Sequence, residues 1–317
     1  AGTIIAQGPA HGDPADGGDP ALGYNVISHH TLRLTNITGG GTITVDNSGT
    51  IEAQACCALD FNSTTDAITV TNSGTIKSVT SAAVAARGTI NFSLNNSGTI
   101  TGSGTVGINS INERYKMVIN LSNIGASTGG SGATIINSGT IQASGNDYHA
   151  ISIGTDEDGG AEDDAFDNVT ITNSGTIAGD QTTGNGVEGH AIRVFSDSSG
   201  TTINVEAEPT FTGGIDLGKT TSTIVLAANI TKDLTIEIYN YDSDLTITDN
   251  LAGNDTYSIT VEDLDSDGAA DDGTLTILGE DLEIGQDNPK YRSENVLTKM
   301  RGLFDAANYI NWHAPED

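Results

Sequence analysis

The sequence predicts an all-β protein: a right-handed, single-stranded parallel β-helix with three short strands per coil of about 24 residues, followed by a C-terminal amphipathic helix. Three observations predict this fold class. The pentapeptide Asn-Ser-Gly-Thr-Ile occurs five times, and an alternating apolar segment precedes its copies. The composition, with 40 Gly and only 5% aromatic residues, favours short strands and tight turns.

The five copies of the pentapeptide are spaced as in a solenoid. Their asparagines lie 25, 24, 41 and 36 residues apart, and they are Asn47, Asn72, Asn96, Asn137 and Asn173. A period near 24 residues is in the range in which each repeat forms one turn of a solenoid. Equivalent asparagines would then lie above one another, and their amides would hydrogen-bond along a column. We expect a structural ladder that fixes the register, in preference to a binding site.

Each repeat contains three strand candidates. An alternating segment such as "TITVD" ends at the motif, where Asn and Gly are expected to bend the chain through the left-handed region before Thr-Ile begins a second strand. A third apolar segment follows in each unit, at 57–61, 82–86, 106–111, 149–153 and 190–195. Since no unit buries its apolar face alone, we expect stacked units with parallel pairing and a shared interior.

The expected organisation has three parts. Residues 1–24 form an irregular lead-in or cap, 25–285 form the β-helix, and 286–317 form a helical segment. The two long intervals indicate insertions near 111–131, as an irregular turn or a protruding hairpin, and near 155–168, as an acidic loop. The helix is expected within 293–313, where Ser293 is a candidate N-cap and apolar residues recur at helical spacing: Val296, Leu297, Met300, Leu303, Phe304, Ala307 and Ile310.

The charge restricts the partners. A net charge of -30 repels phosphate backbones and anionic headgroups, so we expect no nucleic-acid partner. The sequence contains no run of 18 apolar residues, so we expect no membrane insertion of this segment. The chain opens with neither Met nor a basic stretch, as in a mature product after signal-peptide removal. Grouped carboxylates favour divalent cations, and calcium is therefore the expected cofactor.

The strongest candidate calcium site is the segment 263–273. Alternating acids and a glycine resemble the spacing of calcium loops, although Thr274 stands where an EF-hand has Glu, and a solvated acidic turn is the alternative. The candidate ligands are Asp263, Asp265, Asp267, Asp271 and Asp272. A second acidic segment without regular spacing adds Asp156, Asp158, Asp163 and Asp164, and a third adds Asp13, Asp16 and Asp19.

Two histidines and two cysteines are further candidates for a functional or structural role. His149 and His190 each precede Ala-Ile, so we expect them at the same place in their coils, as stacked surface side chains or, less favourably, as two ligands of a transition metal. Cys56 and Cys57 are adjacent, and we expect strand alternation to place one thiol in the core and one outside it, with a strained disulfide between the two neighbours as the alternative.

The "TNSGTI" turns, each followed some ten residues later by "AI" and an apolar residue, and the later "FTGGIDLG" at 211–218 resemble β-helical passenger domains of Gram-negative autotransporters. The resemblance covers about residues 40–310. It implies export across two membranes and display or release at the cell surface. It also implies that the C-terminal helix is similar to the segment that joins a passenger to its membrane barrel.

The sequence favours a non-enzymatic, secreted bacterial surface protein with a structural or adhesive role. Unpaired strands at the solenoid ends favour head-to-tail self-assembly into filaments or a layer, steadied by calcium, and surface glycans are further candidate partners. The alternatives are a monomeric glycan-binding adhesin and a polysaccharide lyase or hydrolase. No catalytic residue is assigned, because the basic side chains Lys77, Arg87 and Arg193 are scattered and the acids Asp60 and Asp66 do not recur at the coil period.

Overall fold

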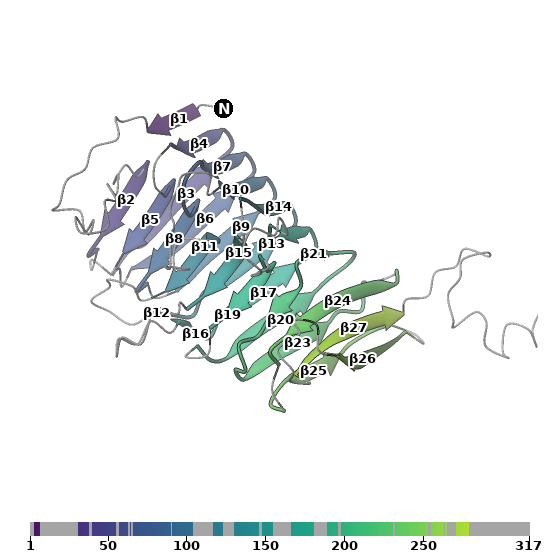
Figure 1. Cartoon of the computed structure of the whole chain (residues 1–317). Helices are drawn as coiled ribbons and strands as arrows, with labels where there is room; N and C mark the ends of the chain where they lie inside the picture. The colour runs from purple at the N-terminus through teal and green to yellow at the C-terminus, as the bar shows by residue number, and fades with distance from the viewer. Residues whose placement is uncertain are drawn as a thin grey trace, which may run out of the picture.

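The computed structural model describes residues 3–6, 31–37, 40–54, 57–62, 64, 66–89, 91–103, 117–122, 130–145, 148–154, 166–180, 189–195, 198–230, 232–241, 243–252, 255–262, 264 and 271–278. Within these ranges the chain forms strands joined by turns, with no helix (Figure 1). None of the described residues therefore belongs to a helix long and apolar enough to cross a membrane.

The strands form three long sheets, here named A, B and C, and one short pair. Sheet A contains, in order, β1 (Thr3–Ala6), β4 (Thr50–Ala53), β7 (Thr75–Ser78), β10 (Thr99–Ser103), β14 (Thr140–Ser144), β18 (Thr176–Ala178) and β21 (Thr210–Thr212). Sheet B contains β2 (Leu32–Thr35), β5 (Leu59–Asn62), β8 (Val84–Arg87), β11 (Met117–Ser122), β15 (His149–Ile153), β19 (Ile192–Val194), β22 (Ile215–Asp216), β24 (Leu234–Tyr239), β27 (Asp272–Leu278) and β26 (Thr256–Glu262).

Sheet C runs in the order β25 (Thr246–Asp249), β23 (Ser222–Leu226), β20 (Thr201–Val205), β17 (Thr170–Asn173), β13 (Thr134–Asn137), β9 (Phe92–Asn96), β6 (Ala67–Asn72) and β3 (Thr42–Asn47). The short pair is β12 (Gly130–Ser131) with β16 (Phe166–Asp167).

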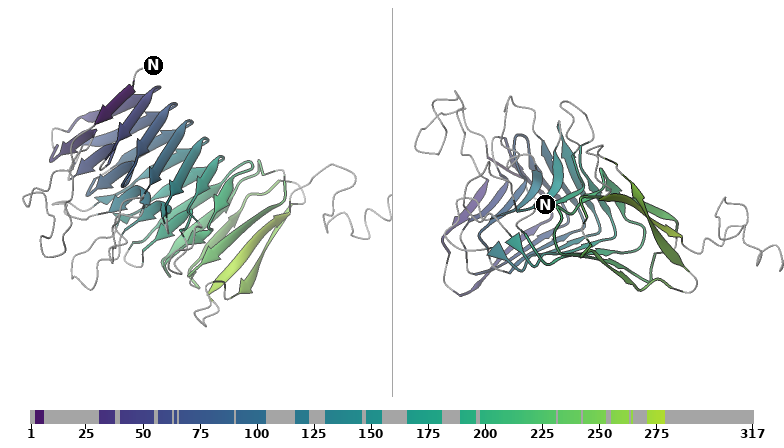
Figure 2. Two further views of the ribbon diagram at one scale, coloured as in Figure 1. Left: turned by 45° about the horizontal axis from the view of Figure 1, so that its top comes forward. Right: turned by 60° about the horizontal axis from the view of Figure 1, so that its bottom comes forward.

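From β3 to β22 the chain visits sheets C, A and B in turn, so each of these circuits adds one strand to each long sheet. The first circuit is β3, β4 and β5, the second is β6, β7 and β8, and neighbouring circuits pair in parallel. Figure 2 shows the strands stacked in sequence order along one axis. The structure is therefore a parallel β-helix with three short strands per coil, and the predicted fold class is confirmed.

The core lies inside the coils and consists of aligned columns of branched aliphatic side chains. In sheet A, Ile76 aligns with Ile100 and Ile100 with Ile141, and all three are buried. Strand alternation directs every second residue inward, and parallel stacking in register places like on like. The column therefore follows from the repeat itself.

The pentapeptide turns do not bend as expected. No Asn or Gly of the five motifs, all of which lie in the described ranges, has a positive φ, so the expected left-handed conformation is wrong. Instead the side-chain oxygen of Asn47 accepts a hydrogen bond of 3.1 Å from the backbone N–H of Gly49. Glycine is required because the coils approach closely: a Cβ on Gly98 would lie 2.2 Å from the carbonyl oxygen of Gly74.

Part of the segment expected as an insertion, Met117–Ser122, is a strand of the solenoid. This segment was assigned to the insertion near 111–131, but it forms β11, which pairs in parallel with β8 and β15 and is buried throughout. It takes the place in the coil that was expected for 106–111, which lies outside the described residues. Both segments are apolar, and only the pairing with neighbouring coils distinguishes them.

The two ends of the solenoid also differ from expectation. Thr3–Ala6, expected in the irregular lead-in, forms β1 and pairs in parallel with β4. At the other end, the parallel coils were expected to continue to about residue 285, but β27 pairs antiparallel with both β24 and β26. Consecutive strands without an intervening coil return as a hairpin, because parallel pairing needs a long crossover. The expected helix within 293–313 lies outside the described residues.

Candidate functional site

The five motif asparagines form a continuous hydrogen-bonded column. The Nδ2 atoms of Asn47, Asn72 and Asn96 each donate a bond of 2.8 Å to Oδ1 of the next asparagine along the column. Asn137 donates a bond of 2.9 Å to Asn173. The column ends there because the next residue in register is Val205. The expected ladder is therefore present, and Nδ2 of its last member, Asn173, is buried without a hydrogen-bond partner in the described structure.

Polar chemistry gathers instead on the outer face of sheet B. Leu59 and Phe61 point into the core, so alternation directs Asp60 outward. The parallel register aligns Asp60 with one residue of each neighbouring strand, and we name this set the polar row: Arg33, Asp60, Ala85, Asn120, Ser152, Arg193, Asp216 and Tyr239. Although the row faces outward, most of it is buried, and Asp60 has an exposed fraction of 0%.

The first charged cluster surrounds Asp60. The Nη2 atom of Arg87 lies 2.7 Å from each carboxylate oxygen of Asp60, and its Nε lies 3.2 Å from Oδ1. The Nε of Arg33, from the preceding strand, lies 3.2 Å from Oδ2. Two guanidinium groups from two coils thus stabilise one buried carboxylate, since a buried charge needs both a counterion and hydrogen bonds.

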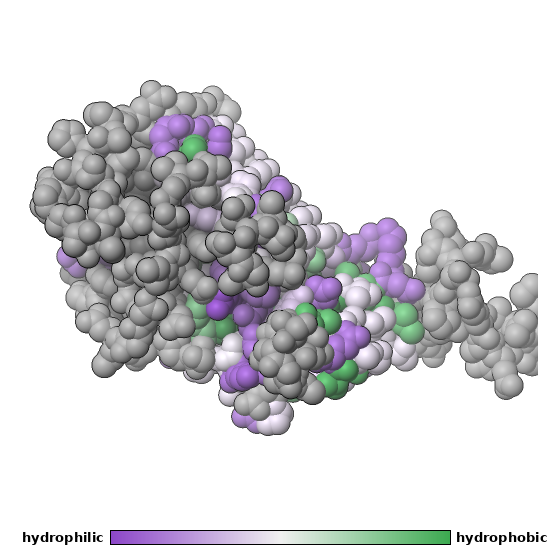
Figure 3. All heavy atoms as spheres, in the orientation of Figure 1, coloured by the Kyte–Doolittle hydropathy of each residue, from purple (hydrophilic) through white to green (hydrophobic). Residues whose placement is uncertain are grey.

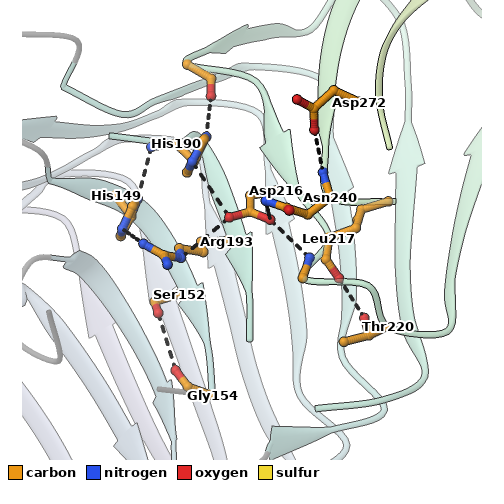
Figure 4. A network of polar contacts seen from close by, with 12 residues as sticks. His149, Ser152, Gly154, His190, Arg193, Asp216, Leu217, Thr220, Asn240 and Asp272 are labelled. Carbon is orange, nitrogen blue, oxygen red and sulfur yellow. Dashed lines mark hydrogen bonds and ion pairs between the residues drawn. The ribbon is translucent and has the colours of Figure 1, made fainter. Parts of the chain in front are cut away.

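The second charged cluster lies four coils further on (Figure 4). The rings of His149 and His190 stack with centroids 5.4 Å apart and planes 4° from parallel. Nε of Arg193 lies 3.5 Å from Oδ2 of Asp216, and Nε2 of His190 lies 3.7 Å from the same oxygen. The expectation that the histidines stack is confirmed, but the expected surface position is wrong, because both side chains are buried.

The hydrogen bonds of this cluster fix the tautomer of His190. At His149, the backbone N–H of His190 donates to Nδ1 at 2.9 Å, while Nη1 of Arg193 lies 3.1 Å from Nε2. Nδ1 of His190 lies 2.9 Å from the carbonyl oxygen of Gly213, which only accepts, so this nitrogen carries the proton. Nε2 of His190 is therefore the atom that faces Asp216.

The network continues along sheet B to its antiparallel end. Asp216 Oδ1 accepts hydrogen bonds from the backbone of Gly218 at 3.0 Å and from Nδ2 of Asn240 at 3.1 Å. The backbone N–H of Asn240 donates in turn to Asp272 at 2.8 Å. Figure 4 shows these contacts linking successive strands. The second cluster therefore ties the last parallel coils to the terminal hairpin.

Only two of the candidate calcium ligands lie in the described ranges. Asp271 pairs with Lys219 at 2.7 Å, and Asp272 is fully buried and also accepts the backbone N–H of Leu264 at 3.0 Å. Burial, followed by the negative charges of Asp271 and Asp272, raises the pKa of Tyr241 above its ordinary value. The other candidate ligands lie outside the described residues: Asp263, Asp265, Asp267, Asp156, Asp158, Asp163, Asp164, Asp13, Asp16 and Asp19.

The described residues around His149 and His190 do not complete a metal site. Among the described residues, no group of three or more His, Cys, Asp or Glu side chains is arranged to hold a metal ion. Cys57 is buried against Ala82 and Ala85, whereas Cys56 lies outside the described residues.

The association of the charged residues differs from expectation. Arg87 and Arg193 are scattered in the sequence, but both contact carboxylates of neighbouring coils, Asp60 and Asp216. Asp216 was not among the predicted site residues. The sequence indicates this contact only when two strands are aligned. Arg193 and Asp216 become neighbours once "AIRV" and "GGIDL" are aligned on their isoleucines.

Comparisons with known proteins gave no match. No family model matches the chain, and neither curated proteins nor solved structures show significant similarity to it.

Proposed function

We propose that this chain is a secreted structural or adhesive protein of a bacterial cell surface, in which the β-helix serves as a rigid stalk. The observation that carries the proposal is the buried polar bonding between coils. The asparagine column links five successive coils inside the rod, and the cluster at Asp60 joins three coils on its outer face. A rod whose coils are joined in this way resists local opening and can hold a binding surface away from the cell that carries it.

The resemblance to autotransporter passenger domains supports the location. Such a chain would be exported and displayed on, or released from, a Gram-negative cell. The charge of -30 fits an extracellular rod, because a strongly charged surface is well solvated.

Calcium is the proposed cofactor of the acidic segments. Asp263, Asp265 and Asp267 supply the alternating carboxylates, while Asp271 and Asp272 have protein partners. Bound calcium would neutralise part of the local charge next to the hairpin and stabilise the fold by mass action. We expect the thermal unfolding midpoint to rise with added calcium and to return to its original value with EGTA. An unchanged midpoint would contradict the proposal.

Self-association is the proposed assembly mode, with filaments or layers as its largest products. Sheet C has a terminal strand at each end of the rod, β3 and β25, and these edges would pair if copies stacked head to tail. In such a stack all three sheets continue from one copy into the next only if they end at the same level along the rod. Sheet B instead continues past β24 by two more strands.

A carbohydrate-directed function is the second candidate, either as a glycan-binding adhesin or as a polysaccharide lyase or hydrolase. The polar row favours it, because the row runs across the stacked coils of sheet B in one direction, as an extended polysaccharide would. Between the two charged clusters, Asn120 Oδ1 and Ser122 Oγ are buried without a hydrogen-bond partner in the described structure. Amide and hydroxyl groups of this kind bind sugar hydroxyls.

One set of assays separates these functions. The purified chain is incubated with cells, with immobilised glycans and with acidic and neutral polysaccharides. A stalk or adhesin is expected to bind without releasing reducing ends or unsaturated sugars. Product release that is abolished by Asp216→Asn, a nearly isosteric change, would replace the proposal with catalysis. No binding to any surface would contradict the adhesive role and leave the stalk role to be tested by display of truncated rods.

A further inference from the structure

We propose that β26 is a self-association strand, which pairs antiparallel with β26 of a second copy about a two-fold axis at Ile259. The pairing would extend sheet B across the contact and join two rods end to end. This inference rests on the proposed function as a surface rod and names the contact through which such a rod associates.

The position of β26 makes this pairing possible. It is the last strand of sheet B, and it pairs with β27 on one side over seven consecutive residue pairs, from Thr256 with Leu278 to Glu262 with Asp272. On the other side, no described strand pairs with it. Alternate N–H and C=O groups of such a terminal strand point away from the sheet and bind a further strand when one is offered.

β26 also lacks the features that usually prevent edge-to-edge pairing. Natural edge strands are short, bulged, or carry Pro or Lys. β26 has seven residues, its register with β27 is unbroken, and its sequence "TYSITVE" contains no Pro, Gly or Lys. The terminal strands of the other sheets, β21, β25, β1 and β3, have three, four, four and six residues. The least protected edge of the described rod is therefore the longest one.

The side chains of β26 present an apolar face. Tyr257, Ile259 and Val261 alternate along the strand, and across the ladder they lie opposite Ile277, Leu275 and Gly273, which continue the inner face of sheet B. The exposed fractions are 36% for Tyr257 and 57% for Val261, and Ile259 is partly buried. Figure 3 shows apolar surface at the end of the rod that carries these strands. An inner face that extends beyond its core is unusual in a monomer.

The strand is complementary to itself in the register that pairs all seven residues. Antiparallel pairing about Ile259 places each Tyr257 opposite a Val261, and Ile259 opposite its own copy. Aromatic and β-branched residues are favourable cross-strand neighbours. On the other face, Thr256 meets Glu262. Any shift of register loses pairs and separates Tyr257 from Val261, so the sequence of the strand favours a second copy as its partner.

The charge pattern permits this contact despite the net charge of -30. Glu262 is the only ionisable group of β26 that is charged at neutral pH, and Oγ1 of Thr274 already donates to it at 2.9 Å. In the symmetric register the two Glu262 side chains lie at opposite ends of the pairing, about 20 Å apart, which exceeds a Debye length of about 8 Å. No like charges face each other within the pairing.

The same strand disfavours a coaxial head-to-tail filament. A copy whose β2 met β26 would stand two strands beyond β24, whereas sheets A and C end earlier, at β21 and β25. Those two sheets would then be interrupted at every junction. A two-fold contact through sheet B alone needs no continuity of the other sheets and closes as a dimer.

Sedimentation of the full chain over a range of concentrations tests the proposal. We expect a monomer–dimer equilibrium whose dissociation constant rises by about ten-fold or more in Val261→Lys, because two lysines then replace the partners of two tyrosines. The matched control is Ile136→Lys, since Ile136 is 43% exposed on β13, an interior strand of sheet C. It should leave the equilibrium unchanged. A wild-type chain that stays monomeric, equal effects of both variants, or filaments that survive Val261→Lys would each overturn the proposal.

Cross-linking gives a second readout that does not depend on the lysine variant. Ile259→Cys places two thiols opposite each other on the axis, so mild oxidation should yield a covalent dimer. Ser258→Cys is the control, because its copies lie diagonally apart, and the wild type reports on Cys56 and Cys57. Cross-linking of Ser258→Cys without Ile259→Cys would overturn the register. A wild-type chain that forms no dimers but still binds to cells would refute this contact and leave the proposed function standing.

Discussion

The side-chain amide of Asn72 donates a hydrogen bond of 2.8 Å to the side-chain oxygen of Asn96, and both side chains are fully buried. The two residues are 24 positions apart and occupy the same place in successive coils. A buried amide that loses its partner costs more than the bond contributes when made. The contact therefore acts mainly against slippage, because a shift of one residue would turn one of the two amides to the opposite face of sheet C and leave the other without its partner.

The first prediction concerns this column. Asn96→Ala removes a donor and an acceptor and leaves the facing atoms of Asn72 and Asn137 without that partner, so we expect a loss of about 2–3 kcal/mol in the free energy of unfolding. Asn95→Ala is the matched control, because Asn95 is exposed on the same strand, and it should change stability by less than about 0.5 kcal/mol. Urea unfolding followed by circular dichroism measures both. Equal losses would contradict a specific role for the column.

The second prediction concerns the close approach of the turns. In Gly98→Ala the added Cβ meets the backbone oxygen of Gly74 at 2.2 Å, and backbone cannot move aside as a flexible side chain can. We expect a loss of about 3 kcal/mol. Gly41→Ala is the control, since its Cβ would lie 3.7 Å from the nearest atom, an oxygen of Asp66. If thermal midpoints fall equally in both, general loss of glycine flexibility would explain the effect better than contact between coils.

The third prediction concerns the buried carboxylate of Asp60. Arg87→Ala removes the nearer of its two guanidinium partners, so we expect a loss of about 3–5 kcal/mol. The exposed pair of Lys232 and Glu208 has the same separation of 2.7 Å, yet Lys232→Ala should cost less than about 0.5 kcal/mol because water screens it. Chemical unfolding of the two variants gives the comparison. A small effect of Arg87→Ala would mean that Arg33 alone compensates the charge.

The fourth prediction concerns alkaline pH. Burial raises the pKa of Tyr148 from 10.0 to about 12. Because the folded pKa is the higher one, the contribution to stability is complete below pH 10.0 and is lost as the pH rises toward 12, by about 2 kcal/mol. Tyr148→Phe should flatten the fall in stability over this interval and remove one late-titrating phenol from the absorbance titration. An unchanged titration curve would contradict the assignment.

Much of the fold was accessible from the sequence because the repeat is local. Asn-Ser-Gly-Thr-Ile fixes where one strand ends and the next begins, and its period near 24 fixes the coil. The column of Asn47, Asn72 and Asn96 followed from these two facts alone. The predicted reason for the glycine, a left-handed turn, was wrong, however. The glycine is needed for the close contact between Gly74 and Gly98, which exists only between coils.

The elements that departed from expectation are those whose local pattern fits two arrangements. Residues 117–122 and 106–111 are both short and apolar, and pairing with β8 and β15 selects the former. The strands β26 and β27 alternate like any solenoid strand, yet they form a hairpin. Alternation reports that one face is buried, and it does not report the direction of the neighbouring strand.

The sequence by itself determined the parallel β-helix, the coil length and the asparagine column, because these depend on a repeated local pattern and on stacking identical units. The tertiary structure decided which polar residues meet. Arg87 reaches Asp60, and Arg193 reaches Asp216, only after chain segments of unequal length have been brought into one register. The physical reason is that loops of different length between strands hide that register in the sequence, whereas backbone pairing restores it in the fold.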